Sequence, residues 1–231
     1  ARRGLAQLGV DLEYDEFAGR ALIHGLFGFG PALTDPAVNR LWLTLDEQFG
    51  LEFGKDRFYS IVQDEAQNQR RHPVKEYFDT LEWDGDPRLD SWLVDYAGAQ
   101  DTSFIRAVGA IVLIAAVRRI REPGCKFDEM LVLEGPQGNQ KSELLKALAA
   151  HDEWFADDLP LNADTKRQME AIAGRWIVEA SELKGMKKGE VEALKSFLSR
   201  STDRARLAYG RLTTEQPRQC IIIGTTNDEQ Y

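Results

Sequence analysis

Cysteine is scarce in this sequence, and its two occurrences, Cys125 and Cys220, lie far apart. A disulfide framework needs several cysteines at close spacing, and a clustered metal site needs neighbouring Cys or His ligands. The sequence therefore favours neither arrangement. It predicts a protein of the reducing cytoplasm.

Long apolar runs and a net positive charge are also missing. The longest apolar run, residues 107–117, is flanked by arginines and is too short to cross a bilayer, so it predicts a buried helix and no membrane partner. The N-terminal stretch ARRGLAQLGV has no apolar core of signal-peptide length. The net charge of −9 argues against bulk coating of nucleic acid, so any such contact must be local.

The apolar content, 43% of 231 residues, is sufficient for a substantial core. Residues 1–71 predict a mainly helical region in which FAGRALIHGLFGF is apolar and glycine-rich. A helix begins at Asp35-Pro36 and runs through Phe49, and another covers residues 56–69. A second helical unit, residues 72–126, follows His72-Pro73, and we expect its helices within residues 74–83, 87–98 and 102–122.

The pattern changes after Pro123-Gly124, where short apolar strands alternate with helices. The strands are MLVLEG, RWIVEA and QCIIIGTTN, and the intervening helices begin at Lys141 and Glu190. This order is typical of a parallel α/β sheet, which we place in residues 127–231. The first residue is not methionine and the chain stops soon after the last strand, so we expect a piece of a longer protein.

A candidate phosphate-binding loop follows the first of these strands. In the pattern GxxxxGK[ST] between a strand and a helix, backbone amides and the helix N-terminus surround phosphate oxygens. Gly135, Lys141 and Ser142 match this pattern, whereas Gln140 stands where the second glycine is expected. A glutamine can adopt helical backbone angles, although its side chain crowds the loop. An ordinary strand, turn and helix is the alternative interpretation.

The loop predicts particular roles for its residues. Lys141 would reach the β- and γ-phosphates of ATP, Ser142 would coordinate Mg²⁺, and the amides from Gly138 onward would surround the phosphates. The full set of expected nucleotide-binding residues is Gly135, Pro136, Gln137, Gly138, Asn139, Gln140, Lys141, Ser142 and Glu143.

An ATPase of this class also needs an acidic residue at the end of a neighbouring strand. RWIVEASEL offers Glu179, to which we assign support of the metal, and Glu182, to which we assign activation of water. After the last strand, Thr226 or Asn227 is placed to contact the γ-phosphate or its water. Solvent-exposed acids at a strand end are the simpler alternative.

A basic segment precedes the last strand. Residues 184–211 contain eight Lys or Arg and three Asp or Glu, in a protein that is acidic overall. Such a cluster near Tyr209 is suited to a nucleic-acid backbone, with charge on phosphates and an aromatic ring for stacking. A solvated helix face followed by a loop explains the same pattern. The candidate contacts are Lys187, Lys188, Lys195, Arg204, Arg206 and Arg211.

Several segments together resemble the virulence-associated protein E family, over most of the chain from about Asp11. They are HPVKEYFDTLEWDGDPRLDSWL, EPGCKFDEMLVLEGPQGNQKS, RWIVEASEL, EALKSFLSRSTDRARLAYGR and PRQCIIIGTTND. The resemblance implies an AAA+-type P-loop fold, similar to superfamily 3 helicases and to the helicase half of phage and plasmid primase-helicases. It also implies a homo-oligomeric ring, a hexamer in the full-length protein, that acts on DNA, often beside a primase region.

By the same resemblance, Lys141 and Ser142 match the Walker A pair, Glu179 and Glu182 the Walker B acids, and Asn227 the sensor residue. The basic segment, with Asp203, corresponds to the part that lies near the central channel in related helicases. Gln140 departs from the strict pattern, and the arginines expected to act in trans beyond the sensor strand are not in the sequence. Before His72 we find no primase zinc site and no cluster of polymerase carboxylates.

The leading hypothesis is therefore a Mg²⁺- and ATP-dependent, ring-forming helicase-type ATPase in the replication of a phage or mobile element. The second is a module that binds nucleotide or nucleic acid and has lost turnover, which Gln140 and the basic segment favour. The third is a small-molecule kinase, against which the long helical region before the loop argues.

Overall fold

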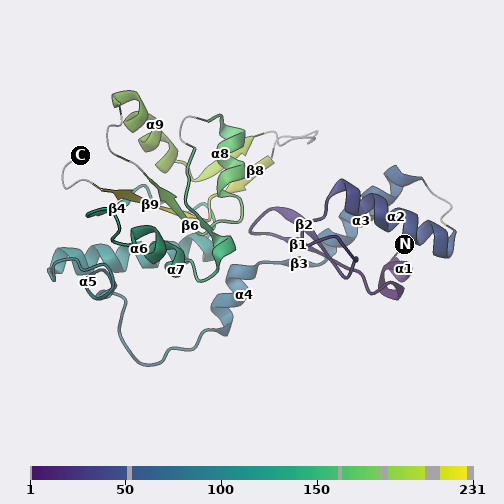
Figure 1. Cartoon of the computed structure of the whole chain (residues 1–231), viewed down its shortest axis with the longest axis horizontal. Coiled ribbons are helices and arrows are strands. Elements are labelled where there is room, and N and C mark those ends of the chain that lie inside the picture. The colour runs from purple at the N-terminus through teal and green to yellow at the C-terminus, as the bar shows by residue number, and fades with distance from the viewer. Residues whose placement is uncertain are drawn as a thin grey trace. The chain divides into compact units, whose positions relative to one another are not determined.

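The computed structural model describes residues 2–50, 54–160, 163–181, 183, 187–205 and 214–227 (Figure 1). The chain divides into two compact units, residues 1–80 and 81–231. From the sequence we expected the first boundary at residue 71 and a separate helical unit over residues 72–126. In the structure the boundary lies after residue 80, and residues 81–126 belong to the same unit as the sheet.

The first unit contains a small sheet that the sequence pattern did not predict. β1 (Asp11–Asp15) pairs antiparallel with β2 (Arg20–His24) and parallel with β3 (Arg70–Arg71). The expectation of a mainly helical region was incomplete, because part of FAGRALIHGLFGF is strand β2. Gly19 and Gly25 bound this strand at φ values of 66° and 82°, which break a helix and permit the turns at its ends.

The helices of this unit agree closely with the sequence prediction. α2 (Asp35–Phe49) has the predicted bounds, with the Thr34 side chain capping its first turn and Gly50 at its C-terminal end. α3 (Lys55–Asn68) lies within one residue of the predicted helix. α1 (Arg2–Gln7) and α4 (Pro73–Thr80) complete the unit.

The sheet of the first unit packs on its helices through an apolar core. Leu12 and Ile23 from the strands meet Leu41 of α2 and Phe58 of α3, all almost fully buried. Outside this core, Arg71 bonds the carboxylates of Glu13 and Glu76, which joins the sheet to α4. The hydrogen bond from Arg71 lowers the pKa of Glu76.

The second unit is built on a parallel sheet with strand order β4-β9-β6-β5. These strands are β4 (Leu131–Glu134), β9 (Ile221–Thr226), β6 (Ile177–Ala180) and β5 (Phe155–Ala156). The three longer ones match the three predicted strands, so the predicted parallel α/β sheet is confirmed.

Helices cover both faces of this sheet (Figure 1). α6 (Ser103–Arg121) and α7 (Lys141–Leu148) contact one face, while α8 (Thr165–Ile172) and α9 (Lys188–Leu198) lie over the other. The short helix α5 (Trp92–Asp95) packs on α6. A hairpin of β7 (Thr202–Ala205) and β8 (Thr214–Pro217) was not anticipated from the sequence.

α6 is buried on one side only, which corrects the expectation of a buried helix. Val112 and Ile120 are buried, whereas Ile111 and Ile114 are each more than half exposed. Two tryptophans hold the helix in place: Trp92 Nε1 donates to the Gly109 carbonyl at 3.0 Å, and Trp176 Nε1 donates to the Ala116 carbonyl at 2.9 Å. None of the helices in the described part of the chain is long and apolar enough to cross a membrane.

A buried ion pair fixes the β7–β8 hairpin against α9. Arg218 donates to both carboxylate oxygens of Asp203, at 2.7 and 3.0 Å, and also to the Phe197 carbonyl at the end of α9. Both charged side chains are at most 3% exposed. Asp203, which the resemblance placed near a channel, therefore has a structural contact.

Removing one partner of this pair leaves the other charge buried without compensation. We expect Asp203→Ala to lower the free energy of unfolding by about 3–5 kcal/mol. Arg204→Ala, on the same strand, removes only an exposed pair with Glu215 and should change it little. Urea unfolding of both variants tests this, and equal stabilities would contradict it.

Candidate functional site

The candidate site lies where the strands of the parallel sheet end. Because β4, β9 and β6 are parallel, their carboxyl ends meet at one edge, and ligands bind at such edges. Strand alternation places Glu179 of β6 and Thr225 of β9 on the face that α7 covers. We had expected the strand of Glu179 to lie next to β4, but β9 lies between them.

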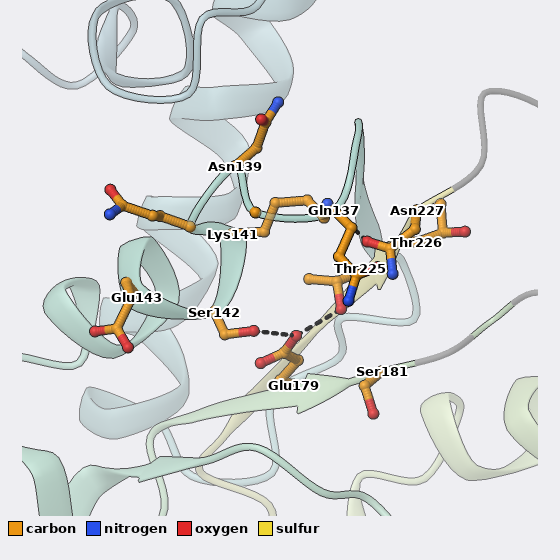
Figure 2. Close-up of a pocket in the computed structure, with 12 residues that line it drawn as sticks. Gln137, Asn139, Lys141, Ser142, Glu143, Glu179, Ser181, Thr225, Thr226 and Asn227 are labelled. Carbon is orange, nitrogen blue, oxygen red and sulfur yellow. Dashed lines mark hydrogen bonds between the residues drawn. The ribbon is translucent and has the colours of Figure 1, made fainter.

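Two hydroxyl groups converge on one oxygen of Glu179 (Figure 2). Ser142 Oγ, in the first turn of α7, donates to Glu179 Oε1 at 2.9 Å, and Thr225 Oγ1 donates to the same atom at 2.5 Å. Glu179 is 2% exposed and Thr225 is 6% exposed. The structure thus brings together Ser142 and Glu179, the two residues predicted to support a metal, and adds Thr225 to them.

The second oxygen of Glu179 shows whether this site suits a cation. Glu179 Oε2 is buried and has no hydrogen-bond partner among the described residues. A buried carboxylate oxygen without a partner is costly unless a donor or a cation compensates it. With the Ser142 hydroxyl close by, these oxygen donors fit Mg²⁺, which prefers carboxylate, hydroxyl and water ligands.

Lys141 connects the loop to the last strand. Its Nζ donates to the carbonyls of Gly135 and Pro136, at 2.8 and 3.0 Å, and to Asn227 Oδ1 at 3.1 Å. Lys141 and Asn227, two of the predicted catalytic residues, are therefore in direct contact. The ammonium group lies over the loop that would hold phosphates.

Gln140 has a left-handed backbone, with φ 53° and ψ 33°. We had expected that helical angles would let a glutamine replace the glycine, but these angles are of the hand that favours glycine. A residue with a Cβ pays of order 1–2 kcal/mol there. Gly138, at φ 90°, provides the second left-handed position of the loop.

A cavity of about 630 Å³ joins these groups. Of the predicted nucleotide-binding residues, Gly135 and Pro136 contact Lys141 and do not line the cavity. The cavity is lined by Gln137, Gly138, Asn139, Gln140, Lys141, Ser142, Glu143, Glu179, Ser181, Thr225, Thr226 and Asn227.

The sequence interpretation missed Thr225. It considered Thr226 and Asn227 because they end the strand, but the face that each residue occupies depends on strand pairing. All six residues of β9 are buried, so the sequence shows no alternation between an inner and an outer face. A polar residue near the end of an otherwise apolar strand was the only available signal.

Three predicted site residues, Glu182, Arg206 and Arg211, lie outside the described residues. The other basic candidates are all exposed: Lys187 and Lys188 at the start of α9, Lys195 on the same helix, and Arg204 on β7. Lys195 pairs with Glu192 and Arg204 with Glu215, which reduces the local positive charge.

Comparison with known proteins gives one family and one group of structures. The model of the virulence-associated protein E-like domain matches residues 78–231. No curated protein matches the chain. Two solved structures of the NrS-1 C-terminal region, one of them its A-form apo structure, are similar at 12% and 15% identity, with TM-scores of 0.55 and 0.50. They match 96% and 98% of this chain, which spans only 55% and 56% of theirs, and they show the fold alone.

The left-handed geometry at Gln140 generates a prediction. Gln140→Gly removes the steric cost but adds flexibility to the unfolded chain, so we expect a net gain of about 0.5–1 kcal/mol in the free energy of unfolding. Gln137→Gly, in the same loop but without a positive φ, should reduce stability. Thermal unfolding compares the stabilities of the two variants. A loss of stability in both would show that the backbone at Gln140 is not strained.

Proposed function

Because the chain belongs to the virulence-associated protein E-like family, we propose that it is the P-loop ATPase part of a replication protein of a phage or mobile element. In this proposal it binds ATP with Mg²⁺ and uses hydrolysis to act on DNA as a helicase of the AAA+ type. The observation that carries the proposal is the cluster of Ser142, Glu179 and Thr225 beside the loop.

Phosphate binding uses the backbone of the loop and the start of α7. The amides from Gly138 to Ser142 would donate to phosphate oxygens, and the helix N-terminus adds a partial positive charge. Lys141 would exchange its loop carbonyls for the β- and γ-phosphates, because a charged oxygen is a stronger acceptor than a carbonyl. The exchange costs little reorganisation, since the lysine already lies over the loop.

Ser142 and Glu179 would hold Mg²⁺, the first through its hydroxyl and the second through its unpaired oxygen or a water. When bound, the ion neutralises charge on the phosphate oxygens. Glu179 or Glu182 would accept a proton from the attacking water. Asn227, released when Lys141 turns to phosphate, would hold that water or the γ-phosphate.

The proposal extends to assembly and partners. A homo-oligomeric ring, hexameric in the full-length protein, would complete each site with arginines from a neighbouring subunit, and a primase region or partner would accompany it. The basic residues of α9 and β7 would contact the DNA backbone, because they are exposed on the unit that carries the site.

One observation favours a second function. The strained Gln140 places a side chain in the loop where glycine is expected, which would crowd the bound phosphates. A module that binds nucleotide or nucleic acid with little turnover is consistent with this geometry. Robust phosphate release by the full-length protein would exclude this alternative.

Nucleotide binding is tested with two lysines of one helix. We expect Lys141→Ala to weaken binding of a non-hydrolysable ATP analogue with Mg²⁺ by about 10- to 150-fold, through loss of charge-assisted hydrogen bonds. Lys146→Ala, farther along α7, removes only a pair with Asp152 and should bind normally. Calorimetry on this chain measures the affinity of both variants. Unchanged binding by Lys141→Ala would contradict the proposal.

In the same comparison, Glu179→Gln should retain ATP binding without Mg²⁺ and lose the Mg²⁺-dependent gain. In the full-length protein it should lower DNA-stimulated hydrolysis about 100-fold or more, as expected for loss of a base or a metal ligand. Equal Mg²⁺ dependence in the variant and the native protein would contradict this role.

Contact between α9 and DNA has its own test. If Lys188 and Lys195 contact phosphates, replacing both by Ala should reduce the slope of log affinity against log salt by roughly 1–2. Lys55→Ala in the first unit is the control and should leave the slope unchanged. The slope is measured from binding to labelled single-stranded DNA over a salt series. An unchanged slope in the double variant would show that these two lysines do not contact the DNA backbone.

A further inference from the structure

A second cavity, of about 790 Å³, adjoins the loop. It shares Gly138, Asn139, Gln140, Lys141 and Glu143 with the first cavity, so the two cavities adjoin along the loop. Its remaining walls come from Leu93, residues 96–99, Ile105, Leu144 and strand β4. All of these residues belong to the second unit.

Apart from Glu134, the side chains that line the walls away from the loop are apolar or aromatic. Leu93 and Leu133 are almost fully buried, and Leu131, Ile105 and Leu144 continue this surface. Tyr96 is 62% exposed and lines the cavity.

The turn after Tyr96 closes back on α5, because the Ala99 N–H donates to the Leu93 carbonyl at 3.0 Å. An apolar surface beside an exposed aromatic side chain suits a flat ligand with apolar faces.

The charges in this cavity disfavour an anion. Glu134 and Glu143 line it. Among the described residues that line it, Lys141 is the only basic one, and it already contacts two carbonyls and Asn227. A second phosphate group would meet repulsion here, whereas a neutral nucleobase would not.

We propose that this cavity receives the base and sugar of the nucleotide whose phosphates occupy the first cavity, with Tyr96 stacking on the base. The inference rests on the proposed function and adds the residues that recognise the nucleoside. A purine covers more of the apolar surface than a pyrimidine, so affinity falls in the order purine triphosphate, pyrimidine triphosphate, inorganic triphosphate.

The test compares variants of Tyr96 with ligands that have or lack a base. Tyr96→Ala should weaken binding of a non-hydrolysable ATP analogue by about 5- to 150-fold, the range for removing a ring that stacks on a base. Inorganic tripolyphosphate should bind native protein and variant equally. Tyr96→Phe keeps the ring and should bind ATP normally, whereas Tyr96→Leu keeps only apolar bulk and should not.

Phe104→Ala is the matched control, because Phe104 is also aromatic, is 72% exposed and does not line the cavity. It should bind both ligands normally. Circular dichroism establishes that the variants fold, and calorimetry with Mg²⁺ provides the affinities.

The outcomes separate the two proposals. ATP that binds no more tightly than tripolyphosphate, or is unaffected in Tyr96→Ala and Tyr96→Leu, overturns the nucleoside cavity and leaves the phosphate site standing. Equal weakening of both ligands in Tyr96→Ala also overturns it, because the effect is then not on the base. Absence of binding by either ligand overturns the proposed function and this inference with it.

Discussion

The arrangement of the second unit depends on one carboxylate oxygen. Glu179 Oε1 accepts hydrogen bonds from Ser142 and Thr225, and so joins α7, β6 and β9, three elements distant in the sequence. A buried carboxylate needs such donors, because burial of its charge is otherwise too costly. The same bonds leave Glu179 Oε2 as the free acceptor at the strand ends. The contacts that compensate the buried carboxylate therefore also leave one oxygen whose chemistry fits a cation.

The loop contains a strained backbone position. Gln140 holds a left-handed backbone that glycine adopts at lower cost, and strain of this kind persists only where its surroundings enforce it. Here β4 and α7 determine the ends of the loop, and Lys141 connects its first residues, Gly135 and Pro136, to Asn227. The loop is thus held closed by a lysine that a phosphate would attract.

Sequence reasoning was successful where local patterns determine structure. The Asp35-Pro36 start of α2, the three long strands and the strand-loop-helix around Lys141 follow from capping, apolar runs and glycine placement. It failed where the pairing of distant segments determines the local structure. β1 and β2 are short, and β2 lies in a glycine-rich stretch that also reads as helical, so only their pairing identifies them as strands. The half-exposed face of α6 was likewise hidden, because its residues are apolar on every side.

The same distinction explains which site residues the sequence identified. Lys141 and Ser142 belong to one local motif, and Glu179 ends an obvious apolar strand, so each was accessible without a structure. Thr225 required the strand order, in which β9 separates β4 from β6 and places its own residue against Glu179. Because β9 lies between the other two strands, Glu179 is connected to the loop in two ways. Ser142 bonds it directly, and Lys141 bonds Asn227, which lies two residues after the Thr225 that also bonds Glu179. In the proposed function, these contacts would link the binding of a phosphate by the loop to the position of the carboxylate, as an ATP-driven protein requires.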